Sequence, residues 1–271
     1  MLRSTLREDV EKELEKYDKA DDVQCEIHPE VNFRYNTVNV LLGQRGSGKS
    51  FNGFFEVAAI SRVPNLYHEF VFVCNNPNDR TFVKMRNQID MPASLVPYDE
   101  SEEYLEEIVE YKQAYDEVKD KHLENLLTDE SKKDICEHLK IRNFNKPSLH
   151  TVILYDDALE VFKKPNSKEY KLLMENRHPK FTYILNIQDW KGISNGLKSN
   201  IDSVWIFGGY PRDRFVYFYG QIRCPVDRER VYEIYKTLGK RQALIFDNYD
   251  DGVIIKLLEE NGQTRILFSN R

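Results

Sequence analysis

The chain has 271 residues, of which 41% are hydrophobic and 31% charged, so it suits a folded globular protein of one large α/β domain or two small ones. No apolar run approaches the roughly 20 residues that a bilayer-spanning helix needs, and the charged N-terminus lacks the apolar centre of a secretory signal. The net charge of −6 gives no general preference for nucleic acid, and four widely spaced cysteines predict a reducing compartment without disulfides.

The N-terminal part of the chain is charged throughout. We interpret residues 1–34 as an N-terminal arm with a helix over residues 5–20, and the stretch Glu26–Arg34 is ambiguous but compatible with an edge strand. Buried strands are predicted at Thr37–Leu42 and His68–Cys74, because both are short apolar runs bounded by turn residues.

Residues 99–142 interrupt the α/β succession of short apolar strands and helices. Apolar side chains recur there at the three- and four-residue spacing of an amphipathic helix, at Leu105, Ile108, Tyr111, Tyr115 and Val118. A second helix is expected from about Glu130 to Leu139. We therefore predict an acidic helical insertion whose apolar stripe is a packing face.

The remaining elements alternate between apolar strands and helices. Strands are predicted at Thr151–Tyr155, Phe181–Ile187, Ser203–Phe207, Phe215–Tyr219, Ala243–Phe246, Val253–Leu257 and Arg265–Phe268, and helices at Ser167–Asn176 and Asp227–Thr237. This alternation is typical of a mostly parallel α/β sheet covered by helices on both faces. Residues 35–271 are thus expected to form one such domain, with the insertion at about 99–142.

A glycine-rich motif, GQRGSGKS, follows the first predicted strand and precedes a helix expected to reach about Ile60. It matches the phosphate-binding loop (P-loop) pattern G-x-x-x-x-G-K-[ST] at every fixed position. In such loops backbone N–H groups surround the phosphates, the lysine contacts the β- and γ-phosphates, and the serine hydroxyl binds Mg²⁺. The predicted nucleotide-binding residues are Gly43, Gln44, Arg45, Gly46, Ser47, Gly48, Lys49 and Ser50.

Polar residues also end two later strands. Asp156 and Asp157 directly follow Thr151–Tyr155, in the pattern of a Walker B motif. Because ligands of parallel sheets bind beyond the carboxyl ends of the strands, these carboxylates should lie beside the P-loop. We assign Asp156 with Ser50 to Mg²⁺, and Asp157 to the general base that activates the attacking water.

Gln188 ends the strand Phe181–Ile187, where an amide could sense the γ-phosphate or orient the water. The neighbouring sequence N-I-Q-D resembles the guanine-recognition motif N-K-x-D without its lysine, so a GTPase is disfavoured. An arginine is also expected to stabilise the charge that develops on the γ-phosphate. Arg177 is the first candidate, followed by Arg212 and Arg214.

Charge is distributed unevenly along the chain. Residues 99–137 contain fifteen acidic residues and five lysines, whereas residues 158–200 contain seven lysines and Arg177 against four acidic residues. The basic segment is compatible with a polyanionic partner and equally with a solvated lysine-rich face.

The P-loop, the helical insertion, VILYDDA, the Asn176-Arg177-His178 turn and the strand ending in Gln188 together resemble the FtsK/HerA superfamily of P-loop ATPases. Within it the chain is most similar to genome-packaging ATPases of large DNA viruses and virophages. The resemblance covers roughly residues 35–250. That superfamily more often has Asp-Glu at the position of Asp156-Asp157. The assigned general base, Asp157, therefore has a shorter side chain than the glutamate that is usual there.

The resemblance implies a homo-oligomeric ring that hydrolyses ATP with Mg²⁺ and moves double-stranded DNA into a viral capsid at its portal vertex. Arg177 would then act across a subunit interface, and five lysines become candidate contacts to DNA phosphates, namely Lys163, Lys164, Lys168, Lys191 and Lys198. The implied location is the virion or the host-cell cytoplasm, without a membrane span.

Two other classes remain open from the residues alone. A P-loop nucleotide or small-molecule kinase would use the same loop, although kinases of this fold often have an arginine-rich lid and the insertion contains only Arg142. A nucleotide-regulated scaffold with vestigial hydrolysis would retain binding without needing Asp157.

Overall fold

The computed structural model describes residues 32–63, 67–75, 82–83, 86–141, 144–145, 149–157, 159–163, 167–191, 193–222, 224–249 and 252–270. The helix predicted over residues 5–20 and residues 26–31 of the stretch Glu26–Arg34 lie outside these residues. None of the helices in the described part of the chain combines the length and apolarity that a membrane crossing needs.

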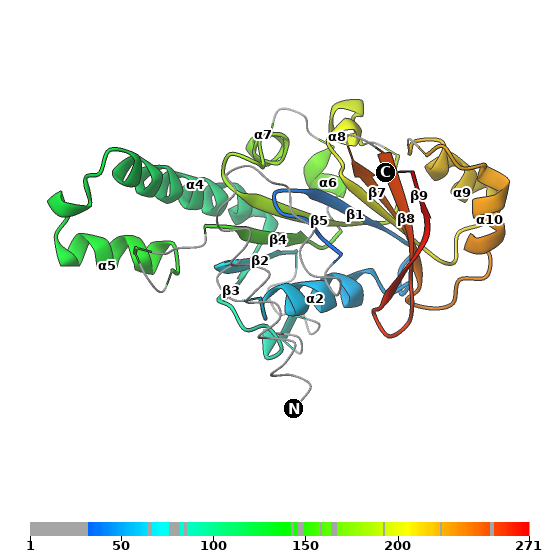
Figure 1. Cartoon of the computed structure of the whole chain (residues 1–271), viewed down its shortest axis with the longest axis horizontal. Helices are drawn as coiled ribbons and strands as arrows, with labels where there is room; N and C mark the ends of the chain where they lie inside the picture. The colour runs from blue at the N-terminus through cyan, green and yellow to red at the C-terminus, as the bar shows by residue number, and fades with distance from the viewer. Residues whose placement is uncertain are drawn as a thin grey trace.

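The described strands form one mixed sheet in the spatial order β3-β2-β4-β5-β1-β6-β7-β8-β9 (Figure 1). Their bounds are β1 Val38–Leu42, β2 Glu69–Val73, β3 Ala93–Val96, β4 Thr151–Tyr155, β5 Phe181–Ile187, β6 Ser203–Phe207, β7 Ala243–Tyr249, β8 Gly252–Leu258 and β9 Thr264–Ser269. The strands from β3 to β6 in this order pair in parallel, whereas β7, β8 and β9 add as antiparallel strands. The prediction of a mostly parallel α/β sheet is confirmed.

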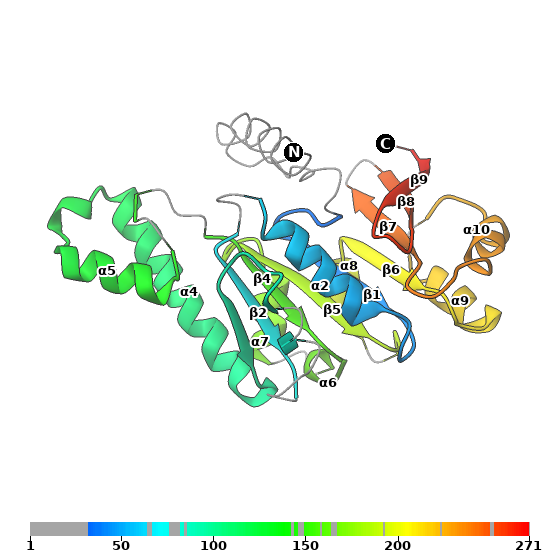
Figure 2. The same ribbon diagram turned by 90° about the horizontal axis from the view of Figure 1, so that it is seen from below.

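Helices cover both faces of the sheet, because buried strands alternate side chains between two apolar layers. Their bounds are α2 Lys49–Ile60, α4 Tyr98–Asp120, α5 Asp129–His138, α6 Leu159–Phe162, α7 Lys168–Met174, α8 Asn195–Ser199, α9 Arg212–Tyr219 and α10 Arg228–Tyr235. Leu41 of β1 packs in the layer of α2, whereas Val40 and Leu42 face the layer of α4 and α6 to α10. Figure 2 shows α2 lying along the sheet.

The predicted helical insertion is confirmed. Helix α4 is anchored on the main core through Leu105 and Ile108, and its far end forms a smaller core with the segment that follows α5. Lys112 is buried between the two, where its ammonium donates to the Thr151 hydroxyl and to the Pro179 carbonyl at 2.9 and 2.7 Å. In Figure 1 α4 and α5 extend away from the sheet.

The strand predicted at Phe215–Tyr219 is wrong, since these residues belong to helix α9. Aromatic and β-branched residues favour strands, which is why the segment resembles one. The buried side chains are Phe215, Phe218 and Tyr219, and this three- and four-residue spacing is that of a helix face. Pro211 precedes the first turn, where its fixed φ starts the helix.

The short elements β3, α6 and α8 were not predicted from the sequence. Each has only four or five residues, so periodicity carries little signal there.

Helix α2 carries a buried carboxyl group, Glu56, which accepts hydrogen bonds from the backbone and side-chain amides of Asn32 at 2.9 and 2.7 Å. Burial raises the pKa of Glu56 from 4.5 to about 7, against the opposing effect of these bonds. The folded protein therefore holds this proton more tightly than the unfolded chain does. The stability that this provides is present below pH 4.5 and is lost as the pH rises to about 7.

We expect the free energy of unfolding to fall by up to about 3 kcal/mol between pH 5 and pH 8 through Glu56. The Glu56→Gln variant cannot titrate at this position, so its stability should fall less over the same interval. Urea unfolding of both proteins at pH 5, 6, 7 and 8 measures the difference, in which other titrating groups cancel. Parallel pH curves for the two proteins would contradict the assignment.

Candidate active site

The P-loop connects β1 to α2 at the carboxyl edge of the sheet. The Gly43 amide donates to the Ile187 carbonyl at 3.2 Å, and the Ser47 amide donates to the Gln44 carbonyl at 3.2 Å, which closes the turn. Gly48 has a φ of +109°, and a Cβ added there would lie 3.0 Å from the Cα of Arg241. This position therefore needs glycine for its backbone conformation and for the close approach of a second loop.

Lys49 and Ser50 begin helix α2 and point into the loop region. The Lys49 ammonium donates to the carbonyl oxygens of Gly43 and Gln44. Burial lowers the pKa of Lys49, and the carboxylates of Asp156 and Asp157 oppose that shift. The negative charges of the two carboxylates thus favour the protonated form of this ammonium.

The predicted site residues on β1, β4 and β5 come together. The Ser50 hydroxyl donates to Asp156 Oδ1 at 2.9 Å, and the Gln188 amide donates to Asp157 Oδ1 at 3.3 Å. Asp157 is exposed with a φ of +58°, a left-handed conformation that aspartate tolerates better than most residues. The backbone therefore turns at the end of β4 and presents the second carboxylate to solvent beside Gln188.

Asn186 is a site residue that the sequence analysis did not assign. Its side chain is fully buried, and its amide donates to Asp156 Oδ1 at 2.9 Å and lies 3.5 Å from the Ser50 hydroxyl. Side chains two residues apart in a strand share a face, so Asn186 lies on the same side of β5 as Gln188. A side-chain amide inside a mostly apolar strand was the available signal.

The donor set at Ser50 and Asp156 fits Mg²⁺. This ion prefers oxygen ligands and is usually bound by one or two protein groups together with substrate phosphates. A hydroxyl and a carboxylate oxygen 2.9 Å apart, beside the P-loop, provide such a pair. Asn186 donates to the same carboxylate and fixes its orientation.

The candidate arginines lie at opposite ends of the parallel strands, Arg212 and Arg214 at the carboxyl ends and Arg177 at the amino ends. Arg212 and Arg214 begin α9 after β6, at the P-loop edge, and are ion-paired with Glu229 at 2.7 Å and Asp189 at 3.3 Å. Arg177 is exposed in the turn before β5, at the opposite edge. Since β5 is seven residues long, Arg177 is at least about 20 Å from the Gln188 of its own chain.

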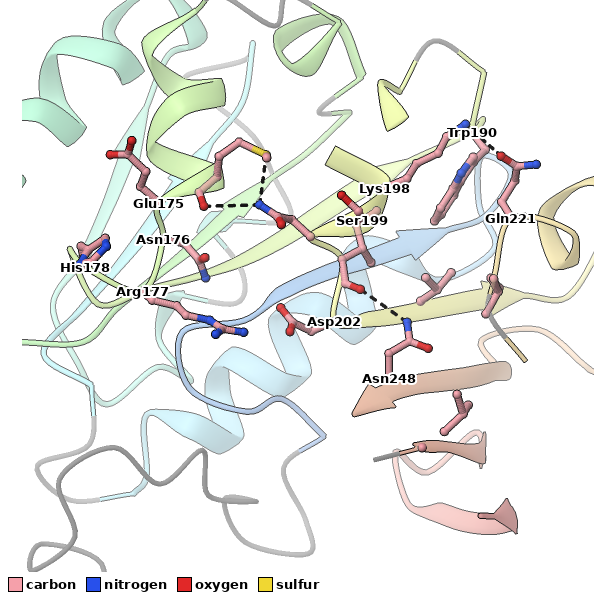
Figure 3. Close-up of a pocket in the computed structure, with 17 residues that line it drawn as sticks. Glu175, Asn176, Arg177, His178, Trp190, Lys198, Ser199, Asp202, Gln221 and Asn248 are labelled. Atoms are coloured by element: carbon pink, nitrogen blue, oxygen red, sulfur yellow. Dashed lines mark hydrogen bonds between the residues drawn. The ribbon is translucent and has the colours of Figure 1, made fainter. Parts of the chain in front are cut away.

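Arg177 borders a cavity of about 690 Å³ that is separate from the P-loop (Figure 3). Its guanidinium extends toward Asp202, whose carboxylate accepts a hydrogen bond from the Val38 amide at 2.8 Å. Burial raises the pKa of Asp202, while Arg34 and Arg177 oppose that shift. Arg177 is thus positioned on a polar outer edge of the protein and not at the P-loop of its own chain.

The predicted basic segment has mixed surroundings. Lys168 forms ion pairs with Glu106 at 2.8 Å and Glu102 at 3.6 Å on α4, and Lys198 donates to the Gln221 side chain at 3.1 Å. Lys191 is exposed near the carboxyl end of β5. Lys164 lies outside the described residues. The acidic insertion therefore neutralises part of this basic segment.

No protein-family model matches the chain, and no curated protein sequence does. Among solved structures, the DNA-packaging ATPase from Sulfolobus turreted icosahedral virus aligns with a TM-score of 0.50 at 17% identity, over 85% of this chain and 96% of that one. The genome-packaging NTPase of Sulfolobus turreted icosahedral virus 2, in complex with AMP, gives 0.51 at 16% identity over the same shares.

ATPases 2 and 3 of EssC from Geobacillus thermodenitrificans align with a TM-score of 0.52 at 16% identity, over 85% of this chain and 39% of that one. The fold is that of a P-loop ATPase. This fold agrees with the resemblance to viral packaging ATPases of the FtsK/HerA superfamily. The loop from Gly43 to Ser50 lies at the carboxyl end of β1, as expected for a P-loop. At identities of 16–17% the likeness concerns the fold alone.

Proposed function

We propose that the protein is an Mg²⁺-dependent ATPase. The observation that carries this proposal is the contact of 2.9 Å between the P-loop residue Ser50 and Asp156 at the end of β4. It joins the two motifs that a nucleoside triphosphate and its metal ion need, although 106 residues separate them in the sequence.

Each site residue then has a role. Residues 43–50 surround the phosphates with backbone amides, Lys49 contacts the β- and γ-phosphates, and Ser50 with Asp156 holds Mg²⁺, which neutralises phosphate charge when bound. Asp157 accepts the proton of the attacking water, and Gln188 donates to Asp157 and orients that water. Arg177 acts on the γ-phosphate of a neighbouring subunit, since its own P-loop is too far away.

We further propose that hydrolysis drives movement of double-stranded DNA into a capsid by a homo-oligomeric ring. The fold shared with two proteins named as viral packaging enzymes supports this assignment. Exposed Lys191 is a candidate phosphate contact, together with Lys163 and Lys198. The corresponding location is the virion or the host-cell cytoplasm, with the capsid or portal vertex as partner.

We expect double-stranded DNA to stimulate ATP hydrolysis several-fold at low salt and to lose this effect between about 50 and 200 mM salt, because phosphate contacts release counterions. Phosphate release by assembled protein, measured with and without DNA, tests this. Lys191→Ala should weaken the stimulation, whereas Lys133→Ala, on the exposed face of α5, should leave it unchanged. An ATPase rate indifferent to DNA at low salt would contradict a DNA motor.

A nucleotide or small-molecule kinase is the competing function. Transfer of phosphate to a nucleoside monophosphate by the monomer would favour the kinase, and phosphate release to water alone favours the ATPase.

A further inference from the structure

The loop before β7 packs directly on the P-loop. The Arg241 amide donates to the Ser47 carbonyl at 3.1 Å, and the Asn52 side chain donates to the carbonyls of Arg241 and Gly48 at 3.2 and 3.0 Å. Arg241 also has a φ of +68°, and it fills the space where a Cβ of Gly48 would lie. The backbone of Arg241 is therefore held on the phosphate-binding loop from two sides.

The Arg241 side chain is exposed and stacks on an aromatic ring. The carbon of its guanidinium lies 4.2 Å from the centroid of the Phe51 ring, and Phe51 directly follows Ser50 in the first turn of α2. Among the described residues no carboxylate pairs with Arg241, unlike Arg212 and Arg214. A planar cation that pairs with no carboxylate in the described part of the chain thus lies beside the proposed phosphate site.

The order of the strands sets the direction of a bound nucleotide. Asp156 and Gln188 lie at the ends of β4 and β5, on one side of β1, and mark the position of the γ-phosphate and Mg²⁺. The strands β6 and β7 lie on the other side of β1 (Figure 2). A phosphate chain with its γ end at Asp156 therefore directs its nucleoside end toward β6 and β7, where Arg241 is located.

We propose that Arg241, backed by Phe51, is the stacking platform for the nucleobase. A purine ring would lie on the outer face of the guanidinium, whose inner face rests on Phe51. Guanidinium planes stack on aromatic rings, and the ring behind Arg241 holds its plane in place before the ligand arrives. This inference rests on the proposed nucleotide site and names the residues that recognise the base.

Base stacking and phosphate contact differ in what they require of the ligand. We expect Arg241→Ala to weaken ADP binding by about 5- to 150-fold, the range for loss of one stacked base. Inorganic tripolyphosphate has no base, so its affinity should stay within about twofold, as expected where no contact is lost. Calorimetric titration of the full-length protein with ADP and with tripolyphosphate, each with Mg²⁺, measures both affinities.

Two further variants make the test specific. Lys240→Ala removes an equal charge from the exposed neighbour in the same loop, and it should leave the ratio of the two affinities unchanged. Phe51→Leu keeps apolar volume but removes the ring behind Arg241, and it should weaken ADP selectively. Thermal unfolding of each variant checks that the loop still folds.

The outcomes separate the two levels of the proposal. Equal loss of ADP and tripolyphosphate in Arg241→Ala would show a phosphate contact and overturn the platform, as would unchanged binding of both ligands. If the protein without any substitution binds neither ADP nor tripolyphosphate, the proposed ATPase function is overturned, and the stacking platform with it.

Discussion

The Arg177→Ala variant is expected to lose about 10³- to 10⁵-fold in ATP turnover, the range for an arginine that acts on the γ-phosphate. Its nucleotide affinity and thermal unfolding should change little, because Arg177 is exposed and lies at the sheet edge opposite to its own P-loop. Phosphate release and ADP titration of the assembled protein measure the two effects separately.

A mixing experiment shows whether Arg177 acts across a subunit interface. Lys49→Ala and Arg177→Ala should each be inactive alone, but a mixed assembly contains interfaces with an intact Lys49 on one side and an intact Arg177 on the other. We therefore expect activity to return on mixing. Demonstrated mixed assemblies without activity would contradict a role in trans.

Arg212→Ala and Arg214→Ala are matched controls, since both arginines are exposed but lie at the P-loop edge in ion pairs with Glu229 and Asp189. A larger loss of turnover in either of them than in Arg177→Ala would move the catalytic arginine to α9.

The Asp157→Asn variant is expected to lose about 10²- to 10⁴-fold in turnover, the usual contribution of a general base. Asparagine has nearly the same shape and also accepts the left-handed backbone at φ +58°. The amide cannot take the proton of the attacking water, so the loss should appear in turnover with nucleotide affinity retained. An unchanged rate would remove Asp157 as the base and favour a scaffold with vestigial hydrolysis or another base.

Asp156→Asn provides the comparison for Asp157→Asn. Asp156 contacts Ser50 and Asn186 and is assigned to the metal ion, so this variant should require more Mg²⁺ for half-maximal rate. Titration of the rate with Mg²⁺ distinguishes the two carboxylates. If both variants respond to Mg²⁺ in the same way, their separate roles are not supported.

Much of the site follows from local sequence, because strand ends carry positional information. In a parallel sheet the carboxyl ends of β1, β4 and β5 meet at one edge, so residues that end these strands must be neighbours. Asp157 and Gln188, 31 residues apart in the sequence, are indeed in hydrogen-bond contact. The central parallel strands were predicted from apolar runs of five to seven residues, because burial on both faces of the sheet leaves no alternation of polar and apolar residues.

Other features could not be predicted from local sequence. The segment Phe215–Tyr219 has the side chains of a strand and forms a helix, because its packing partners on α10 and in the core select the helical spacing. Asn186 is polar inside an apolar strand, and only the position of Asp156 explains it.

The sequence alone determined the P-loop, its expected strand and helix, the two carboxylates and Gln188, because each depends on the residues next to it in the chain. Tertiary structure decided where Arg177 and Arg241 lie. Arg177 precedes β5 and is carried to the edge opposite to the P-loop, whereas Arg241, nearly 200 residues after Gly43, is brought onto the loop. Both positions depend on strand order and direction, which arise from packing of the whole sheet and not from local propensity.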